Sequence, residues 1–322
     1  MALYRNKLGR DALDLLVQVA ESYYIDNKNQ SEIAKLFNIS ASKVSRLLSR
    51  ARAEGVVRIA VAHPNGRNNE LERALYQEFA LKEAIVARGW LGAFDKEEVL
   101  PKIGKAAAPY IDAIISPGMV IGVGHSDSVA ALIHALRPLA TPRYITIVQV
   151  LGDYRIQHEP ARSAEINRLM AEMYTGTSYY LNAPTLVEDP SVAESLWRTR
   201  GVSEVLPFYS RLDMMLVGVG PLRDSPLEAN GLLRPSQIDQ LEAAGAVGDI
   251  CGHFFNGDGS LADDAYPGQV IAMGWEQLRH CPRVVAVAAG NNKVKALRAL
   301  LTGRIIHMLV TDERTAQLIL DK

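Results

Sequence analysis

The stretch from residue 29 to residue 49 constrains the fold most strongly, because caps, a turn and apolar spacing agree within it. Asn29 can cap a short helix, and Glu32 three residues later can complete a capping box. Asn38 tolerates the left-handed backbone of a tight turn, and Ser40 can cap the helix that follows. The apolar positions that would fix the crossing of the two helices are Ile33, Ala34, Phe37, Ile39, Val44 and Leu47. This pattern predicts a helix, a three-residue turn and a second helix, which is a helix-turn-helix.

Patterns on either side extend this motif to a small domain. Apolar residues recur at helical spacing over residues 11–25, which predicts a preceding amphipathic helix. Gly55 is placed to end the last helix, and the β-branched run at residues 56–61 suits a short strand or wing. Residues 63–69 are polar and rich in turn formers, so we expect a linker or domain boundary there.

Beyond this linker, apolar runs alternate with amphipathic helical patterns. The runs predicted as strands are residues 84–87, 119–123, 144–150, 214–219, 284–288 and 305–310. Near-continuous apolar strands separated by helices are typical of a mainly parallel sheet that is covered on both faces. The predicted fold class is therefore α/β, with a winged-helix-like helix-turn-helix domain at residues 1–62 and a larger α/β domain at residues 63–322.

The net charge of −1 conceals an uneven distribution along the chain. Residues 1–62 hold ten Lys/Arg and six Asp/Glu, a balance of +4, and the rest of the chain carries −5. A basic segment attracts DNA phosphates, whereas a chromatin-type structural protein would need a large basic surface. The apolar runs are too short to span a bilayer, and Cys251 and Cys281 form no metal-binding pattern. We therefore expect a cytoplasmic protein that contacts no membrane and holds no metal or cofactor.

The outward face of the second predicted helix carries residue types that read DNA. Small and hydroxylated side chains near a helix N-terminus let the backbone approach bases and phosphates. Arg46 has the planar fork needed for bidentate contact with guanine, whereas Lys43, Arg50 and Arg52 suit phosphate contacts. The residues predicted to meet the major groove are Ser40, Ala41, Ser42, Lys43, Ser45, Arg46, Ser49 and Arg50. The alternative is an ordinary three-helix bundle whose basic side chains are merely solvated.

A second candidate site follows the predicted strand at residues 119–123. The segment reads as strand, polar loop and helix, with Ser126, Asp127 and Ser128 at the helix N-terminus. The backbone amides at a helix N-terminus favour an oxygen-rich ligand. Asp127 could instead be a helix cap that contributes local stability only.

Several segments together resemble the SorC family of bacterial regulators, also called the SorC/DeoR sugar-binding family. They are residues 30–48, 119–131, 248–259, 288–298 and 309–316, and the resemblance covers essentially the whole chain. It implies a C-terminal domain with the fold of ribose-phosphate isomerases and glucosamine-phosphate deaminases, used for effector sensing and oligomerisation. It also implies a homotetramer that binds palindromic double-stranded operators and responds to sugars or sugar phosphates.

Carried over by motif, the resemblance implies a ligand pocket built from four segments. Its residues are Gly124, His125, Ser126, Asp127, Ser128, Gly152, Asp249 and Lys293. Phosphate-binding members usually show a Gly-Thr-Thr-like loop where this chain has Asp127, and a carboxylate repels phosphate. An unphosphorylated sugar or polyol and a sugar phosphate both stay open as effectors. Lys293 would supply positive charge, or it could be an exposed lysine at the start of a helix.

The main rival prediction is a sugar-phosphate isomerase or deaminase that carries a regulatory DNA-binding head, because fold alone does not decide function. Against it, no paired carboxylates and no Ser/His/Asp order can be placed around one pocket. We therefore predict a transcriptional regulator of a carbohydrate operon and not an enzyme. Its operator affinity would change as effector binding shifts how the subunits pack.

Overall fold

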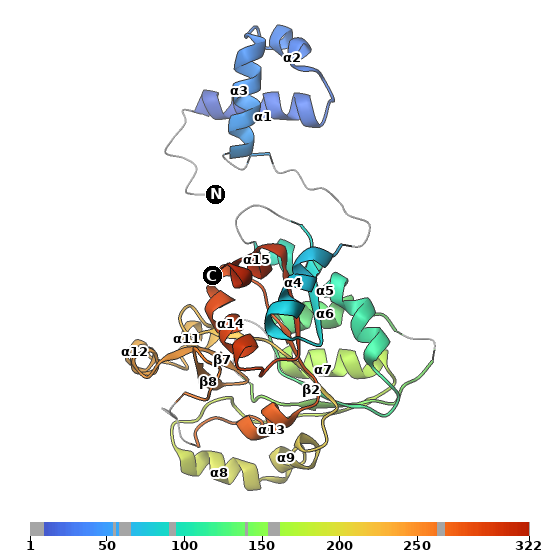
Figure 1. Cartoon of the computed structure of the whole chain (residues 1–322), viewed down its shortest axis with the longest axis vertical. Helices are drawn as coiled ribbons and strands as arrows, with labels where there is room; N and C mark the ends of the chain where they lie inside the picture. The colour runs from blue at the N-terminus through green and yellow to red at the C-terminus, as the bar shows by residue number, and fades with distance from the viewer. Residues whose placement is uncertain are drawn as a thin grey trace. The chain divides into compact units, whose positions relative to one another are not determined.

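The computed structural model describes residues 10–53, 56–57, 66–89, 95–138, 141–153, 162–262 and 268–321. The chain divides into two compact units, residues 1–61 and residues 62–322 (Figure 1). The predicted boundary after residue 62, most of the predicted wing and Gly55 lie outside the described residues. Of the predicted wing, Val56 and Val57 form a bend.

The small unit contains three described helices: α1 (Arg10–Tyr24), α2 (Gln30–Leu36) and α3 (Ala41–Ala53). The predicted capping box is confirmed, since the Asn29 side chain accepts the amides of Ser31 and Glu32 at 3.0 Å and the Glu32 carboxylate accepts the Asn29 amide at 2.8 Å. Asn38 has a φ of 50° in the turn, as predicted. The buried centre of the unit is formed by Val19, Ile33, Val44 and Leu48.

The large unit is built on a seven-stranded sheet in the order β1-β10-β9-β5-β2-β3-β4. Its strands are β1 (Glu83–Ala87), β2 (Val120–Val123), β3 (Thr146–Gln149), β4 (Thr177–Tyr179), β5 (Met214–Val217), β9 (Val284–Val287) and β10 (Met308–Asp312). Every pairing in this sheet is parallel, which confirms the predicted α/β class. The strand predicted at residues 305–310 begins only at Met308, because Arg304 adopts a left-handed backbone and the chain is still turning there.

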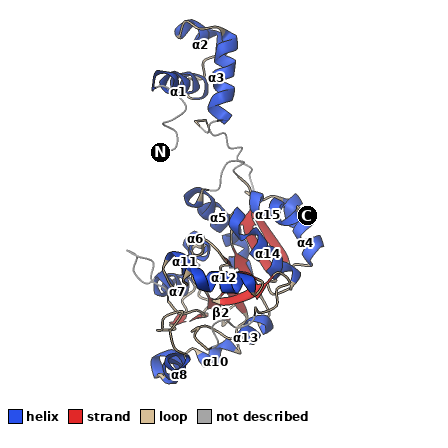
Figure 2. Cartoon of the chain, turned by 90° about the vertical axis from the view of Figure 1, so that its left-hand side faces the viewer, coloured by secondary structure: helices blue, strands red, loops and turns tan. Residues whose placement is uncertain are grey.

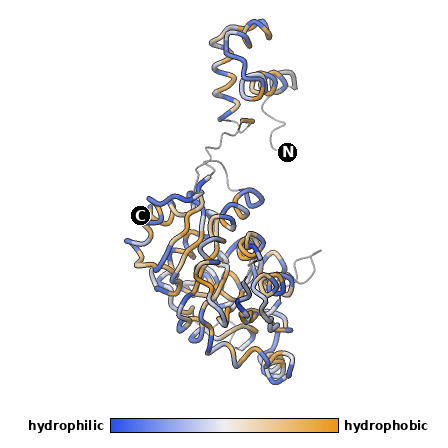
Figure 3. The backbone as a smooth tube through the Cα atoms, turned by 90° about the vertical axis from the view of Figure 1, so that its right-hand side faces the viewer, coloured by the Kyte–Doolittle hydropathy of each residue, from blue (hydrophilic) through white to orange (hydrophobic). Residues whose placement is uncertain are grey.

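Helices cover both faces of this sheet (Figure 2). Alternate residues of one strand enter different cores: Ile85 packs with α5, α6 and α7, whereas Val86 packs with α4, α13, α14 and α15. The helices of the first face are α5 (Lys96–Ile114), α6 (Asp127–Ala135) and α7 (Arg162–Met173). Those of the second face are α4 (Asn69–Phe79), α13 (Trp275–His280), α14 (Val294–Thr302) and α15 (Glu313–Leu320). Burial on both faces explains why the strands are almost wholly apolar, and Figure 3 shows hydrophobic residues gathered inside the unit.

A second, antiparallel sheet was not predicted. It consists of β6 (Gly220–Pro221), β7 (Ala246–Ile250) and β8 (His253–Asn256). Cys251 and Gly252 connect β7 to β8 with φ angles of 52° and 75°, the geometry of a two-residue hairpin turn. The remaining described helices of the large unit are α8 (Pro190–Arg198), α9 (Arg200–Ser203), α10 (Leu206–Tyr209), α11 (Pro226–Ala229), α12 (Pro235–Ala243) and the short helix η2 (Asn291–Lys293). Within the described residues, no helix is long and apolar enough to cross a bilayer.

Candidate functional site

A cavity of about 260 Å³ lies in the large unit at the carboxyl ends of the central strands. The chain leaves β2 toward β3 on one side, whereas β5 on the other side leads toward β9, so the strand order reverses between β2 and β5. Open α/β sheets bind ligands at such a switch point. The loops that follow β2 and β5 line the cavity, together with β7, the Cys251-Gly252 turn and η2.

Two glycines allow these loops to approach one another. A Cβ atom on Gly218 would lie 2.5 Å from both Cβ and Oγ of Ser126. A Cβ atom on Gly220 would collide with the Asp249 carboxylate. The loop after β5 therefore fits between the loop after β2 and strand β7 only because these two positions lack a side chain.

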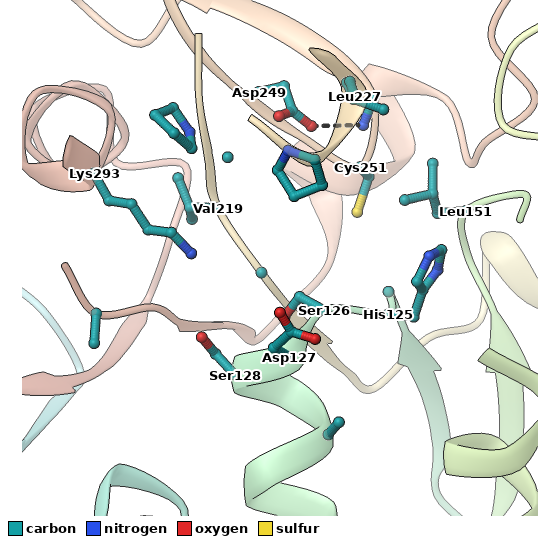
Figure 4. A pocket seen from close by; sticks show the side chains of 18 of the residues that line it. His125, Ser126, Asp127, Ser128, Leu151, Val219, Leu227, Asp249, Cys251 and Lys293 are labelled. Carbon is teal, nitrogen blue, oxygen red and sulfur yellow. Dashed lines mark hydrogen bonds between the residues drawn. The ribbon is translucent and has the colours of Figure 1, made fainter. Parts of the chain in front are cut away.

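Five charged side chains line the cavity: Asp224 and four that act on one another. Lys96, at the start of α5, forms an ion pair with Asp127, the first residue of α6. Lys293 enters from η2 and lies close enough to Asp127 and Asp249 for both carboxylates to favour its charged form. Figure 4 shows Lys293, Asp127 and Asp249 around one cavity, each carried by a different element.

Burial shifts the titration of two of these groups. It raises the pKa of Asp249 to about 6, although the Gly252 amide donates to Oδ2 of Asp249 at 3.3 Å and Lys293 adds favourable charge. Burial also lowers the pKa of Lys293, against the opposing effect of Asp127 and Asp249. Both side chains are thus partly withdrawn from water, which strengthens the hydrogen bonds that a ligand makes with them.

The rest of the lining is partly apolar and partly polar. Leu100, Leu151, Ile166, Val219 and Leu227 supply apolar surface. Polar side chains come from residues that flank the charged groups, and they are His125, Ser126, Ser128, Thr185 and Asn292. Ser126 caps α6, because its Oγ accepts the Val129 amide at 3.1 Å. A few polar groups on an apolar wall are typical of a site for one small, oxygen-rich molecule.

A second candidate surface lies on α3 of the small unit. Val44, Leu48 and Ala51 are buried, and the helix carries four basic and no acidic residues. All eight residues predicted to meet DNA are exposed: Ser40, Ala41, Ser42, Lys43, Ser45, Arg46, Ser49 and Arg50. Nε of Arg46 donates to the Ser42 carbonyl at 3.4 Å, which is a weak contact that a base could replace. This face has the charge and the small side chains that a recognition helix needs.

Comparisons with known proteins match two family models to different parts of the chain. Residues 63–321 match the family described as "Putative sugar-binding domain", and residues 18–67 match a helix-turn-helix domain. The chain belongs to the SorC family of transcriptional regulators. It is 29% identical to the sorbitol operon regulator of Klebsiella pneumoniae, over 96% of this chain and 98% of that protein.

Other relatives are also regulators. The erythritol catabolism regulatory protein EryD of Brucella abortus (strain 2308) is 29% identical, over 94% of this chain and 95% of that protein. The crystal structure of the full-length sorbitol operon regulator SorC from Klebsiella pneumoniae has a TM-score of 0.72 at 28% identity and covers 97% of this chain and 100% of its own. Membership in this family confirms the predicted transcriptional regulator and counts against the rival isomerase or deaminase.

The structure brings seven of the eight predicted pocket residues to one cavity: Gly124, His125, Ser126, Asp127, Ser128, Asp249 and Lys293. Gly152 is not among the lining residues. Its amide donates to the Ile271 carbonyl at 2.9 Å, and a Cβ atom there would lie 2.5 Å from the Pro184 carbonyl oxygen. Gly152 is thus a point of close backbone packing, and its neighbour Leu151 reaches the cavity instead.

Sequence reasoning missed other lining residues, above all Lys96 and Asn292. Lys96 contacts Asp127 only because α5 packs against α6, and no pattern in the sequence around either residue predicts that contact. Asn292 could have been found, since it directly precedes Lys293 in the segment that carries the resemblance.

Proposed function

We propose that the protein is a DNA-binding regulator of a carbohydrate operon, and that a sugar, polyol or sugar phosphate bound in the cavity controls its operator affinity. One observation carries the proposal: the chain that encloses a small cavity with charged and polar groups at the sheet's switch point also presents an exposed basic helix face without acidic residues. The SorC-family relatives named for sorbitol and erythritol support small carbohydrates as the effector class.

In this proposal α3 lies in the major groove. Arg46 reads a guanine through two parallel hydrogen bonds, while Lys43 and Arg50 contact phosphates. Ser40, Ala41, Ser42, Ser45 and Ser49 keep the helix surface small enough for the backbone to approach the bases. The partner is double-stranded operator DNA, and the protein acts in the cytoplasm where that DNA lies.

In the cavity, Asp249 and Asp127 accept hydrogen bonds from effector hydroxyl groups and Lys293 donates to an effector oxygen. The serines and backbone amides at the start of α6 complete the site. Gly124 and His125 form the wall of the loop after β2, and Gly152 supports the site from behind Leu151.

We further propose a homotetramer that binds palindromic operators, with effector binding changing how the subunits pack. Palindromic half-sites match a two-fold protein axis, so their spacing reports the distance between paired α3 helices. Light scattering on the full chain with and without duplex would give four copies per complex, and a one-copy complex would contradict this assembly.

The test of the function is a duplex selected from a random library by the full-length protein, followed by fluorescence anisotropy. Arg46→Ala should weaken binding by about 5- to 150-fold, because a good bidentate contact contributes about 1–3 kcal/mol. The matched control is Lys28→Ala, which removes a partly exposed cation between α1 and α2 that is paired with Asp26. Equal losses of duplex affinity in both variants would show that Arg46 contributes only general charge attraction and reads no base.

The effector half of the test adds carbohydrates to the same anisotropy assay. At least one sugar, polyol or sugar phosphate should change the affinity for the selected duplex, and Lys293→Met should abolish that response while duplex binding remains. A protein that binds no selected duplex, or whose duplex affinity no such compound alters, does not have the proposed function.

A further inference from the structure

The charged groups around the cavity point to a narrower effector class than the proposed function requires. Among the lining residues, the carboxylates are Asp127, Asp224 and Asp249 and the ammonium groups are Lys96 and Lys293. The cavity therefore carries one more negative than positive group before any ligand enters. A phosphate ester would add further negative charge to this excess, whereas a polyol adds none.

The position of Asp127 strengthens this point. Phosphate sites in α/β folds commonly use the amides at a helix N-terminus together with its positive dipole end. Here the N-terminus of α6 already has a negative charge beside it, because its first residue is Asp127, whose side chain is 26% exposed. Oγ of Ser126 also accepts the Val129 amide, so that amide is not free to bind a phosphate. A phosphate bound at this helix end would lie against a carboxylate.

Both ammonium groups at the cavity lie close to carboxylates that a phosphate would also approach. Lys96 is paired with Asp127, and most of its side chain (58%) faces outward. Within the described residues, Lys293 makes no ion pair with either Asp127 or Asp249, but it is near enough for the negative charges of both carboxylates to act on it. A phosphate that took Lys96 would leave the partly buried Asp127 carboxylate without its partner, and one at Lys293 would lie in the field of Asp127 and Asp249.

We infer that the effector is an uncharged polyol or unphosphorylated sugar, whose hydroxyl groups donate to Asp127 and Asp249 and accept from Lys293. This inference rests on the proposed function and goes further, because it excludes the phosphate ester that the sequence left open. Asp127 is the residue that sets this specificity: its carboxylate accepts a hydroxyl and rejects a phosphoryl group.

The test is titration calorimetry on the full-length protein with matched pairs. The probes are erythritol, D-sorbitol and the free aldoses of four to six carbons, each beside its phosphate monoester, with inorganic phosphate as competitor. We expect the best uncharged member to bind at least tenfold more tightly than its own ester, and we expect no competition from millimolar inorganic phosphate.

Asp127→Asn should reverse this order, because the amide removes one negative charge and frees Lys96. Affinity for the uncharged ligand should fall about tenfold, while affinity for its phosphate ester should rise. Glu194→Gln is the matched control, since it removes an exposed carboxylate on α8 that is also ion-paired. Equal melting temperatures of both variants and the wild type would show that Asp127→Asn folds.

The outcomes separate this inference from the proposed function. A phosphate ester that binds wild-type protein more tightly than its parent sugar, and shifts duplex affinity, overturns the inference and leaves the regulator intact. An unchanged ester-to-sugar ratio in Asp127→Asn also overturns it. Failure of both ligand classes to alter duplex affinity overturns the proposed function, and the inference falls with it.

Discussion

Single residues decide how closely the loops of the cavity approach, and Gly218 is the clearest case. Gly218→Ala would place a Cβ atom 2.5 Å from Cβ of Ser126, which lies next to the backbone and cannot rotate away. The loop that carries Ser126 and Asp127 must then move, so effector affinity should fall by about tenfold or more, as sub-ångström displacements in binding sites commonly cost. Calorimetry with the best ligand would measure the loss.

Gly201→Ala serves as the control for this substitution, because nothing lies within 4 Å of a Cβ atom at Gly201 in α9. It should leave effector affinity unchanged and raise stability slightly, since alanine favours a helix. Equal effector affinity in the Gly218 and Gly201 variants would show that the close approach to Ser126 has no part in binding.

Asp249 gives a prediction about pH. Its pKa is raised to about 6 by burial, so the folded protein holds this proton to a higher pH than the unfolded chain does. Between about pH 4 and pH 6 the folded state therefore binds more protons, and wild-type stability falls as the pH rises. Since one pKa unit corresponds to about 1.4 kcal/mol, the loss is at most about 3 kcal/mol.

Asp249→Asn removes this titration. Urea unfolding should show the variant gaining stability relative to wild type from about pH 4.5 to pH 7.5. Glu194→Gln, an exposed substitution on α8, should run parallel to wild type over the same range. Parallel profiles for Asp249→Asn as well would mean that the ionised carboxylate is not destabilised in the folded protein.

At the scale of elements, α2 depends on its cap. It is only seven residues long, so most of its stability comes from Asn29, Glu32 and the buried Ile33. Asn29→Ala should destabilise the helix by about 1 kcal/mol, because two backbone amides lose their acceptor. Faster hydrogen exchange of the Ser31 and Glu32 amides would report this.

Glu32→Gln separates the cap from general charge effects, since glutamine can complete a capping box as glutamate does. It should leave exchange at these amides nearly unchanged. Because α2 packs against α3, Asn29→Ala should also weaken duplex binding modestly, whereas Glu32→Gln should not. Identical exchange rates in both variants would contradict a stabilising role for the Asn29 side chain.

Elements with a local signal were predicted from the sequence, and those defined by distant contacts were not. The cap at Asn29, the turn at Asn38 and the apolar run at β9 each carry their signal within a few residues. Strands β4 and β6 are three and two residues long and contain polar residues or proline, so no periodicity marks them. They are strands only because longer neighbours supply hydrogen-bond partners.

The same reasoning holds for the candidate site. Asp127 was found because a strand, a loop and a helix follow one another in sequence, and Asp249 and Lys293 came from the family resemblance alone. Lys96 and Thr185 reach the cavity through the packing of α5 and of a loop distant in sequence. The prediction named Gly152, one residue away from Leu151, which lines the cavity. A sequence motif locates the segment that reaches a site, but the packing of the backbone decides which of its side chains enters the cavity.

At the scale of the whole molecule, each unit has its own core, so DNA reading and effector sensing reside in separately packed structures. The effector can change operator affinity only if its own affinity differs between the arrangement of the protein that binds DNA and the arrangement that does not. A fragment of residues 62–322 should bind effector as the full chain does without DNA, and should show no response to duplex.

The same linkage makes a quantitative prediction for the full chain. If the effector changes duplex affinity by some factor, a saturating duplex must change effector affinity by the same factor in the same direction. Coupling of about 1–3 kcal/mol would make that factor about 5 to 150. Anisotropy would give the first ratio and calorimetry the second, in one buffer and at one salt concentration, because phosphate contacts make duplex affinity depend on salt. Arg46→Ala should lower duplex affinity and leave the ratio unchanged, since Arg46 contacts DNA in whichever arrangement binds it. Two ratios that differ beyond error would show that the effector detected by calorimetry acts at a site other than the one that controls DNA binding.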